Sequence, residues 1–77
     1  MQRYEAKSEI TGLVWKITKS VGEVVAEGDI LMIFESMKME MEIRAPAGGR
    51  VVEICCQLGR AVQNGQRVAV LALEEVP

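Results

Sequence analysis

Few side chains in this sequence could take part in covalent chemistry. It has no histidine, the commonest general acid, general base and metal ligand. Its two cysteines, Cys55 and Cys56, are adjacent, and adjacent cysteines cannot join distant segments as a disulfide framework would. With only these ligands, a structural zinc site is not expected. Lys38, in contrast, lies in an unusually regular stretch.

Around Lys38 the sequence alternates between apolar and charged residues without exception. Residues 37–44 read Met-Lys-Met-Glu-Met-Glu-Ile-Arg. In a β-strand this alternation places the methionines and the isoleucine on one side and the charged residues on the other. The reversal into this strand must fall between Ser36 and Met39. Lys38 is therefore predicted to point outward at or beside the tip of a hairpin.

Nothing in the sequence activates Lys38 as a catalytic amine. A lysine nucleophile must be partly neutral near pH 7, whereas an unperturbed lysine has a pKa of ~10.4. Its charged neighbours Glu35, Glu40 and Glu42 favour the protonated amine. The chain also lacks a paired nucleophile and base. The sequence therefore predicts that the chain is not an enzyme and that another protein acts on Lys38.

Length and composition limit the partners and the compartment. The chain is expected to form one domain over residues 1–77, because 49% hydrophobic and 26% charged residues are typical of a small globular protein. A net charge of −2 without a basic stretch argues against nucleic acid. No apolar run reaches the ~20 residues of a membrane span, and no signal peptide opens the chain. A cytoplasmic location away from membranes is expected.

An internal repeat provides the framework that must position Lys38. Sliding the sequence by 37 residues aligns six identical residues, three of them glycines. A repeated glycine indicates a repeated backbone requirement, usually a positive φ in a turn. The glycine spacings are equal in the two halves, so neither half has an inserted loop there. The identical pairs are Gly12 and Gly49, Val14 and Val51, Ile17 and Ile54, Gly22 and Gly59, Val25 and Val62, and Gly28 and Gly65.

The segments between the glycines have the pattern of short strands. They are rich in β-branched residues, and none has a 3.6-residue period over a dozen residues, which rejects helical repeats of similar length. Asn64-Gly65 is a hairpin signal, Glu27-Gly28-Asp29 occupies the corresponding place, and residues 45–49 form a turn between the halves. The sequence therefore predicts an all-β fold with about eight strands in two small antiparallel sheets packed face to face.

The offset alone does not show whether a two-fold axis relates the halves. If it does, the lysine tip and the chain end lie at opposite ends, because Lys38 corresponds to Glu75 near the end of the chain. Trp15 is expected to pack against the sandwich, with Cys56 pointing inward and Cys55 outward. The predicted core takes the inward side of each strand: Ile17, Leu31, Ile33, Val52, Ile54, Val68 and Val70.

Residues 35–40, Glu-Ser-Met-Lys-Met-Glu, resemble the biotin attachment motif of the biotinyl/lipoyl domain family, in which a lysine lies between two methionines on a β-hairpin. The resemblance extends over nearly the whole chain, through Gly12, the turns at residues 21–23 and 27–29, and the stretch 45–49. It implies a flattened sandwich of two four-stranded antiparallel sheets with quasi-two-fold symmetry. The equal glycine spacings make the chain similar to the carriers that lack an extra thumb loop.

The resemblance also implies a function. A biotin protein ligase would join biotin to the ε-amine of Lys38. A biotin carboxylase would then carboxylate the cofactor with ATP and bicarbonate, and a carboxyltransferase would pass the carboxyl group to an acceptor. Met37 and Met39 are expected to flank the cofactor at a partly exposed tip and to be read by the ligase, while Met41 only packs. The remaining ligase-recognition residues would be Glu35, Ser36 and Glu40, although the glutamates could serve solubility alone.

Two departures and two alternatives accompany this interpretation. Ser36 replaces the commoner alanine, which is a small-for-small change. Lipoyl domains share the fold and the lysine tip, commonly with alanine after the lysine, so Met39 is the discriminating neighbour and favours biotin. A lipoyl carrier and an unmodified binding module remain the alternatives. The opening methionine favours a free-standing carrier subunit, although a domain taken from a longer carboxylase could begin in the same way.

Overall fold

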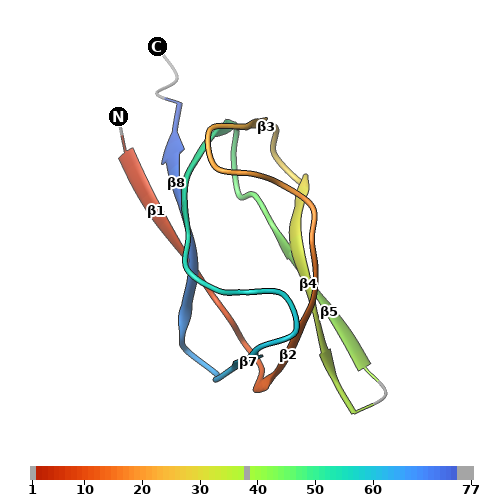
Figure 1. The fold of residues 1–77 in the computed structure, drawn as a ribbon. Coiled ribbons are helices and arrows are strands. Elements are labelled where there is room, and N and C mark those ends of the chain that lie inside the picture. The colour runs from red at the N-terminus through yellow and green to blue at the C-terminus, as the bar shows by residue number, and fades with distance from the viewer. Residues whose placement is uncertain (1, 38, 75–77) are drawn as a thin grey trace.

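The computed structural model describes residues 2–37 and 39–74, which form two four-stranded antiparallel sheets. The strand order is β1-β8-β6-β3 in one sheet and β5-β4-β2-β7 in the other, and the two sheets face each other (Figure 1). The predicted all-β sandwich is confirmed. In the described part of the chain, no helix is long and apolar enough to cross a membrane. The strands are β1 Gln2–Lys7, β2 Gly12–Ile17, β3 Val24–Val25, β4 Ile30–Ser36, β5 Met39–Arg44, β6 Gly49–Ile54, β7 Ala61–Val62 and β8 Arg67–Leu73.

The 37-residue repeat relates the two sheets. Every strand boundary has a counterpart displaced by 37 residues, so that β2, β3 and β4 correspond to β6, β7 and β8, and β1 corresponds to β5. The pairings match as well, with Ser36 opposite Met39 in one sheet and Leu73 opposite Gln2 in the other. The correspondence turns the strand order of one sheet into that of the other, and the reverse. Such a mutual exchange of two sheets is what a two-fold axis produces. The pseudo-two-fold symmetry left open by the sequence offset is thus present in the structure.

The hairpin and the chain ends lie at opposite ends of an elongated molecule. β1 begins and β8 ends at one end, and the β4–β5 turn lies at the other (Figure 1). The principal extents are 42 × 19 × 18 Å, so the hairpin projects along the long axis. Lys38 and Glu75, whose correspondence led to this expectation, lie outside the described residues.

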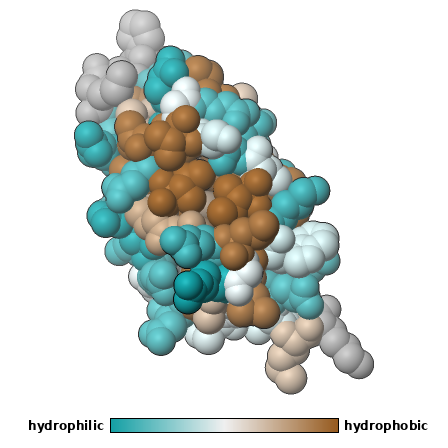
Figure 2. All heavy atoms as spheres, viewed as in Figure 1, coloured by the Kyte–Doolittle hydropathy of each residue, from teal (hydrophilic) through white to brown (hydrophobic). Residues whose placement is uncertain are grey.

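Side chains from both sheets form two adjoining buried clusters. Of the predicted core residues, Leu31, Val68 and Val70 are buried. Ile17 and Ile54 are half-buried and pack against these clusters, whereas the prediction was wrong for Ile33 and Val52, which are only half-buried. Apolar atoms accordingly reach the surface across the middle of the face shown in Figure 2. The largest fully buried apolar residues are Phe34, Leu31, Met32, Leu71, Val14, Val51, Val62 and Val68.

β-Bulges explain why simple alternation failed. The register shifts between Val14 and Lys16 in β2, and between Val51 and Glu53 in β6. A bulge adds one residue to a strand and changes which side the following residues face. Regular alternation through Ile54 predicts that Val52 faces the core, whereas the buried residue is Val51.

The same bulge accounts for Trp15, which was predicted to pack against the sandwich. It lies within the register shift of β2 and is 51% exposed, so that prediction was wrong. The neighbouring Val14 takes the inward position and is buried. The large aromatic side chain is therefore at the surface, where it contributes little to the core.

Asn64-Gly65 forms a turn but not the predicted hairpin. Gly65 has a φ of 88° and its counterpart Gly28 has a φ of 87°, as the repeated glycine predicted. The strands on either side, β7 and β8, belong to different sheets, so the turn carries the chain across the sandwich. The dipeptide indicates a tight reversal, whereas the sheet that receives the next strand depends on long-range pairing.

Candidate functional site

The β4–β5 hairpin is the site that the sequence predicted, and its backbone is now defined. Among the described strands, β4 and β5 are the one consecutive pair that hydrogen-bond to each other. Ser36 lies opposite Met39, which leaves two residues for the connection. Met37, the first of them, has a φ of 56°, and a positive φ at this position is required by the primed two-residue turns. Lys38 itself lies outside the described residues, so its orientation remains a prediction.

A methionine at a positive φ is unfavourable compared with glycine. The left-handed conformation costs roughly 1–2 kcal/mol for residues with a Cβ, and asparagine or glycine are the usual choices in such turns. The β4–β5 pairing, which runs from Ile30 opposite Arg44 to Ser36 opposite Met39, must hold the turn in place. The residue type at position 37 is therefore not the one that the turn prefers, which indicates selection of its side chain.

The methionines at the tip are exposed. Met37 is 94% and Met39 72% exposed, whereas Met41, further along β5, is half-buried. This confirms the predicted exposure at the tip and excludes the alternative that Met37 and Met39 fill the core. Two polarizable apolar side chains in water provide contact area for another protein. The tip can therefore be recognised by an enzyme that acts on the residue between them.

Glu35 and Glu40 lie directly opposite each other in the β4–β5 ladder, and both are exposed. Like charges at directly opposed positions destabilise a sheet. The fold therefore gains nothing from this pair, which favours a recognition role over a purely structural one. Ser36, the third predicted recognition residue, is half-buried at the end of β4.

Two residues that support the hairpin were not identified as site residues from the sequence. Phe34 is fully buried two residues before Ser36 and anchors the end of β4 in the core. Gly12 lies beside the same segment, on the neighbouring strand β2, where an added Cβ would be 2.5 Å from the backbone oxygen of Glu35 and 3.3 Å from the Cβ of Ser36. The repeat had marked both positions, since Phe34 aligns with Leu71 and Gly12 with Gly49. It did not show that they support the hairpin.

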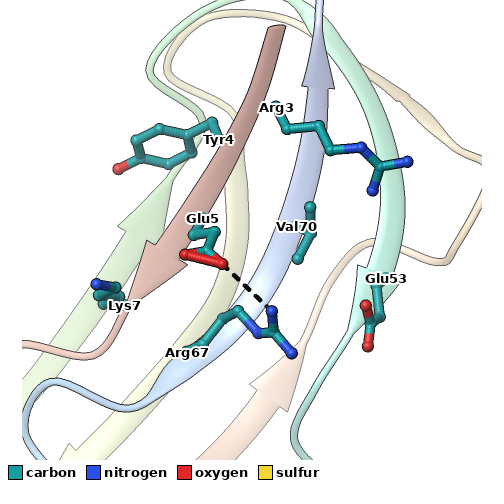
Figure 3. Close-up of a pocket in the computed structure, with 7 residues that line it drawn as sticks. All are labelled: Arg3, Tyr4, Glu5, Lys7, Glu53, Arg67 and Val70. Carbon is teal, nitrogen blue, oxygen red and sulfur yellow. Dashed lines mark hydrogen bonds and ion pairs between the residues drawn. The ribbon is translucent and has the colours of Figure 1, made fainter.

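One surface depression lies elsewhere, over β1, β8 and β6. It has a volume of about 470 Å³ and is open and charged (Figure 3). Arg67 donates a hydrogen bond from Nη1 to Oε1 of Glu5 over 3.2 Å, and this bond, with Cys55 and Glu53 nearby, raises the pKa of the guanidinium. The side chains that line the depression form an ion pair, but they do not place a nucleophile beside a general base. The lining residues are Arg3, Tyr4, Glu5, Lys7, Glu53, Arg67 and Val70.

The cysteines are not placed for metal binding or nucleophilic chemistry. Cys56 points inward as predicted, with its Sγ 3.6 Å from Sδ of Met32. Burial raises the pKa of Cys56, and burial and Glu53 raise the pKa of Cys55, so both thiols stay protonated at neutral pH. Within residues 2–37 and 39–74, no three metal-binding side chains come together.

The fold and the exposed hairpin define a class of small carrier-type domains, and comparison with known proteins specifies the family. A family model described as biotin-requiring enzyme, the biotin/lipoyl family, matches residues 5–71. The chain therefore belongs to the biotinyl/lipoyl attachment family.

Three curated relatives illustrate the range of this family. The chain is 32% identical over 68 residues to the biotinylated protein TB7.3 homolog of Mycobacterium leprae, covering 88% of this chain and 96% of that protein. It is 37% identical over 62 residues to the biotin carboxyl carrier protein of acetyl-CoA carboxylase from Solanum lycopersicum, covering 80% and 89%. It is 45% identical over 64 residues to urea amidolyase of Saccharomyces cerevisiae, covering 83% of this chain but spanning only 4% of that protein.

Among solved structures, the lipoyl domain of the 2-oxoglutarate dehydrogenase complex from Azotobacter vinelandii is similar, with a TM-score of 0.72 and 31% identity. The match covers 80% of this chain and 78% of that domain. Biotinyl and lipoyl domains thus share this fold, and the fold alone does not specify the cofactor.

Proposed function

We propose that this chain is a biotin carrier domain in which biotin is attached to the ε-amine of Lys38. The observation that carries the proposal is the exposure of Met37 and Met39, the two residues that flank Lys38 in the sequence. The relatives that the chain covers almost completely are named as a biotinylated protein and a biotin carboxyl carrier protein. The domain is thus a carrier and not a catalyst.

The described residues suit a group that must leave the domain and enter other active sites. The hairpin projects along the long axis, and the described pockets, over β1, β8 and β6, beside Cys56, and between β1 and β5, do not include its tip. Met37 and Met39 would flank the attached biotin, and Glu35, Ser36 and Glu40 would form the surface read by the ligase. When attached, biotin supplies an atom that accepts and releases a carboxyl group. The role that we propose for the chain is to present Lys38 to those active sites.

Three partners follow from this role. A biotin protein ligase would modify Lys38, a biotin carboxylase would load the carrier, and a carboxyltransferase would unload it. Two further relatives are named as the biotin carboxyl carrier protein of Streptococcus mutans and pyruvate carboxylase of Bacillus subtilis, which agrees with partners from a carboxylase. We also propose that residues 1–77 act as one domain, because both sheets contribute to the same buried cluster, and that it works in the cytoplasm, where free cysteines such as Cys55 and Cys56 are usual.

Lipoyl attachment is the second candidate, because a lipoyl domain shares the fold. Met39 separates the two, since lipoyl domains commonly have alanine after the lysine. The relatives covered over most of their length are named for biotin, which agrees with this choice.

Intact mass after co-expression with a biotin ligase and, separately, with a lipoyl ligase tests the proposal. A biotinyl adduct that forms only with the biotin ligase and is lost in Lys38→Ala supports it. A lipoyl adduct would overturn the cofactor and keep the carrier architecture. Absence of any adduct on folded protein would leave only the unmodified binding module.

A further inference from the structure

The pseudo-symmetry provides an internal control for what the fold requires at each position. Leu13 and Trp15 on β2 are 52% and 51% exposed, which is unusual for such large apolar side chains. Their counterparts on β6 are Arg50 and Val52. Arg50 donates from Nη1 to the backbone oxygen of Gly22 over 2.7 Å, so the same backbone position accepts a charged residue. The fold does not need leucine or tryptophan at positions 13 and 15.

Leu13 lies beside the hairpin. In the sheet, Leu13 is opposite Ala61 on one side and Glu35 on the other, and Glu35 is opposite Glu40. One row across the sheet thus leads from Leu13 to the acidic pair next to the tip. The preceding residue, Gly12, lies beside Glu35 and Ser36 in the same sheet. An exposed apolar surface therefore continues into the acidic base of the hairpin.

Leu58 extends this surface on the side away from the hairpin. The turn that contains it is joined to β2 by two backbone bonds, from the Gly59 nitrogen to the Val14 oxygen over 2.8 Å and from the Val14 nitrogen to the Arg60 oxygen over 2.9 Å. Leu58 is 63% exposed. We call this surface the β2 face; it consists of Leu13, Trp15 and Leu58 together with Glu35 and Glu40.

The equivalent row at the other end of the molecule has different chemistry. There Arg50 is opposite Val24 and Ala72, and Ala72 is opposite Arg3. Leucine is thus replaced by arginine, and the glutamates by alanine and arginine, on the same backbone. A partner with apolar and basic side chains would bind the β2 face through apolar contacts and its negative charges. The same partner would be repelled by the arginines at the symmetry-related position. The difference directs a partner to the end that carries the lysine.

We propose that the β2 face is the docking surface for the biotin carboxylase component, which would present apolar side chains bordered by lysine or arginine. The inference rests on the proposed function of the hairpin. The carrier must return to this enzyme in every cycle and leave again, and a small apolar centre with a charged rim suits a transient interface of this kind. The ligase acts once on each chain and has the tip and the acidic pair beside it, Glu35 and Glu40, to recognise.

The symmetry also supplies the test variants. Leu13→Arg combined with Trp15→Val installs the residues that the fold already uses at the mates, Arg50 and Val52, so folding should be retained. Val21→Ser combined with Val24→Ser is the matched control, because both valines are exposed and Val24 lies in the other sheet, opposite Arg50. Circular dichroism and thermal unfolding establish that each variant is folded.

The experiment uses biotinylated carriers and a purified biotin carboxylase that carboxylates the wild-type carrier with ATP and bicarbonate. The Leu13→Arg, Trp15→Val variant should raise the KM for the carrier by about tenfold or more, as expected for the loss of anchor side chains at an interface. The kcat at saturating carrier, the activity toward free biotin and the rate of ligase modification should stay within about twofold. The control variant should behave as wild type.

An unchanged KM for the carrier would overturn the docking surface. A parallel loss of ligase rate would also overturn it and assign the β2 face to the ligase. The same rise in KM for the control would show that the effect is not specific to this face. A wild-type carrier that accepts no biotin contradicts the proposed function itself, and this outcome is seen before any variant is compared.

Discussion

At one end of this molecule β4 and β5 are joined by a two-residue turn, whereas at the other end their counterparts β8 and β1 carry the ends of the chain. The ladders are equivalent residue by residue, from Ser36 opposite Met39 to Ile30 opposite Arg44, and from Leu73 opposite Gln2 to Lys7 opposite Arg67. The same backbone arrangement thus occurs at both ends of the molecule. Differences between the two ends therefore reflect more than the requirements of the fold.

Those differences are chemical. Beside the turn, Glu35 and Glu40 face each other, and the equivalent positions at the other end are Ala72 and Arg3. Met37 takes a positive φ that glycine would occupy more easily, and it remains exposed. Each of these choices is unfavourable or neutral for stability. Their concentration at the hairpin end indicates selection for recognition, and the following variants test this contrast.

The largest expected effect comes from the buried supports of the two ends. Phe34→Ala should lower the free energy of unfolding by about 3–5 kcal/mol, and Leu71→Ala, at the symmetry mate, by about 2–5 kcal/mol, because each leaves a cavity. Urea unfolding measures both. If either change cost less than about 1 kcal/mol, the equivalence of the two supports would be wrong. Where Phe34→Ala does not fold, Phe34→Leu makes the same comparison with a smaller loss.

Substitution of the glycines beside the two ends, Gly12 and Gly49, should distinguish effects on stability from effects on recognition. Gly12→Ala and Gly49→Ala should each cost about 1–3 kcal/mol, because an added Cβ would collide with the backbone of Glu35 or of Ala72. In protein that is still folded, only Gly12→Ala should slow biotinylation, since it displaces the strand that leads into the turn. Ligase kinetics on both variants provide the measurement. Equal rates for the two would contradict a special role for Gly12.

Removing the like-charge pair should have a smaller and opposite effect on stability. Glu35→Gln should raise the free energy of unfolding by about 0.2–1 kcal/mol, because Glu40 then no longer faces a like charge. The same change should slow the ligase. Arg3→Gln, at the mate of Glu40, serves as the control and should leave the ligase rate unchanged. Because Arg3→Gln changes the net charge in the opposite direction, opposite changes in ligase rate for the two variants would mean that the ligase responds to net charge and not to position.

The smallest expected effect is on pH dependence. The pKa values of Cys55 and Cys56 are raised above their ordinary value of 9.0 in the folded protein, so the folded state holds these protons more tightly than the unfolded state. Their contribution to stability is complete below pH 9.0 and is lost as the pH rises through the folded pKa values. Urea unfolding between neutral pH and alkaline pH should show this fall. The Cys55→Ser, Cys56→Ala variant should show a shallower fall; an identical slope would contradict the assignment.

Much of this architecture could be predicted from the sequence because it depends on local signals that occur twice. Gly28 and Gly65 mark turns with positive φ, and the strict alternation after Met37 predicted a strand with an exposed tip. Such features follow from the chemistry of single residues and their neighbours. The hairpin could therefore be located without knowledge of the sheets.

The predictions that were wrong concern features that depend on pairing between distant strands. The exposure of Trp15 and the half-burial of Val52 result from bulges, which are visible only when β2 and β6 are aligned with their partners. The turn at Asn64-Gly65 joins different sheets for the same reason. The β2 face was also missed, because an exposed Leu13 becomes informative only beside its symmetry mate Arg50.

The central claim is that Lys38, one lysine of four, is the attachment site because it is the residue between the exposed Met37 and Met39. Peptide mapping of the wild-type chain after limited exposure to biotin ligase tests this most directly, since Lys7, Lys16 and Lys19 lie on the same chain as internal controls. We predict that the biotinyl group is found on Lys38 alone. Biotin on any of the other three lysines at a comparable rate would contradict the account.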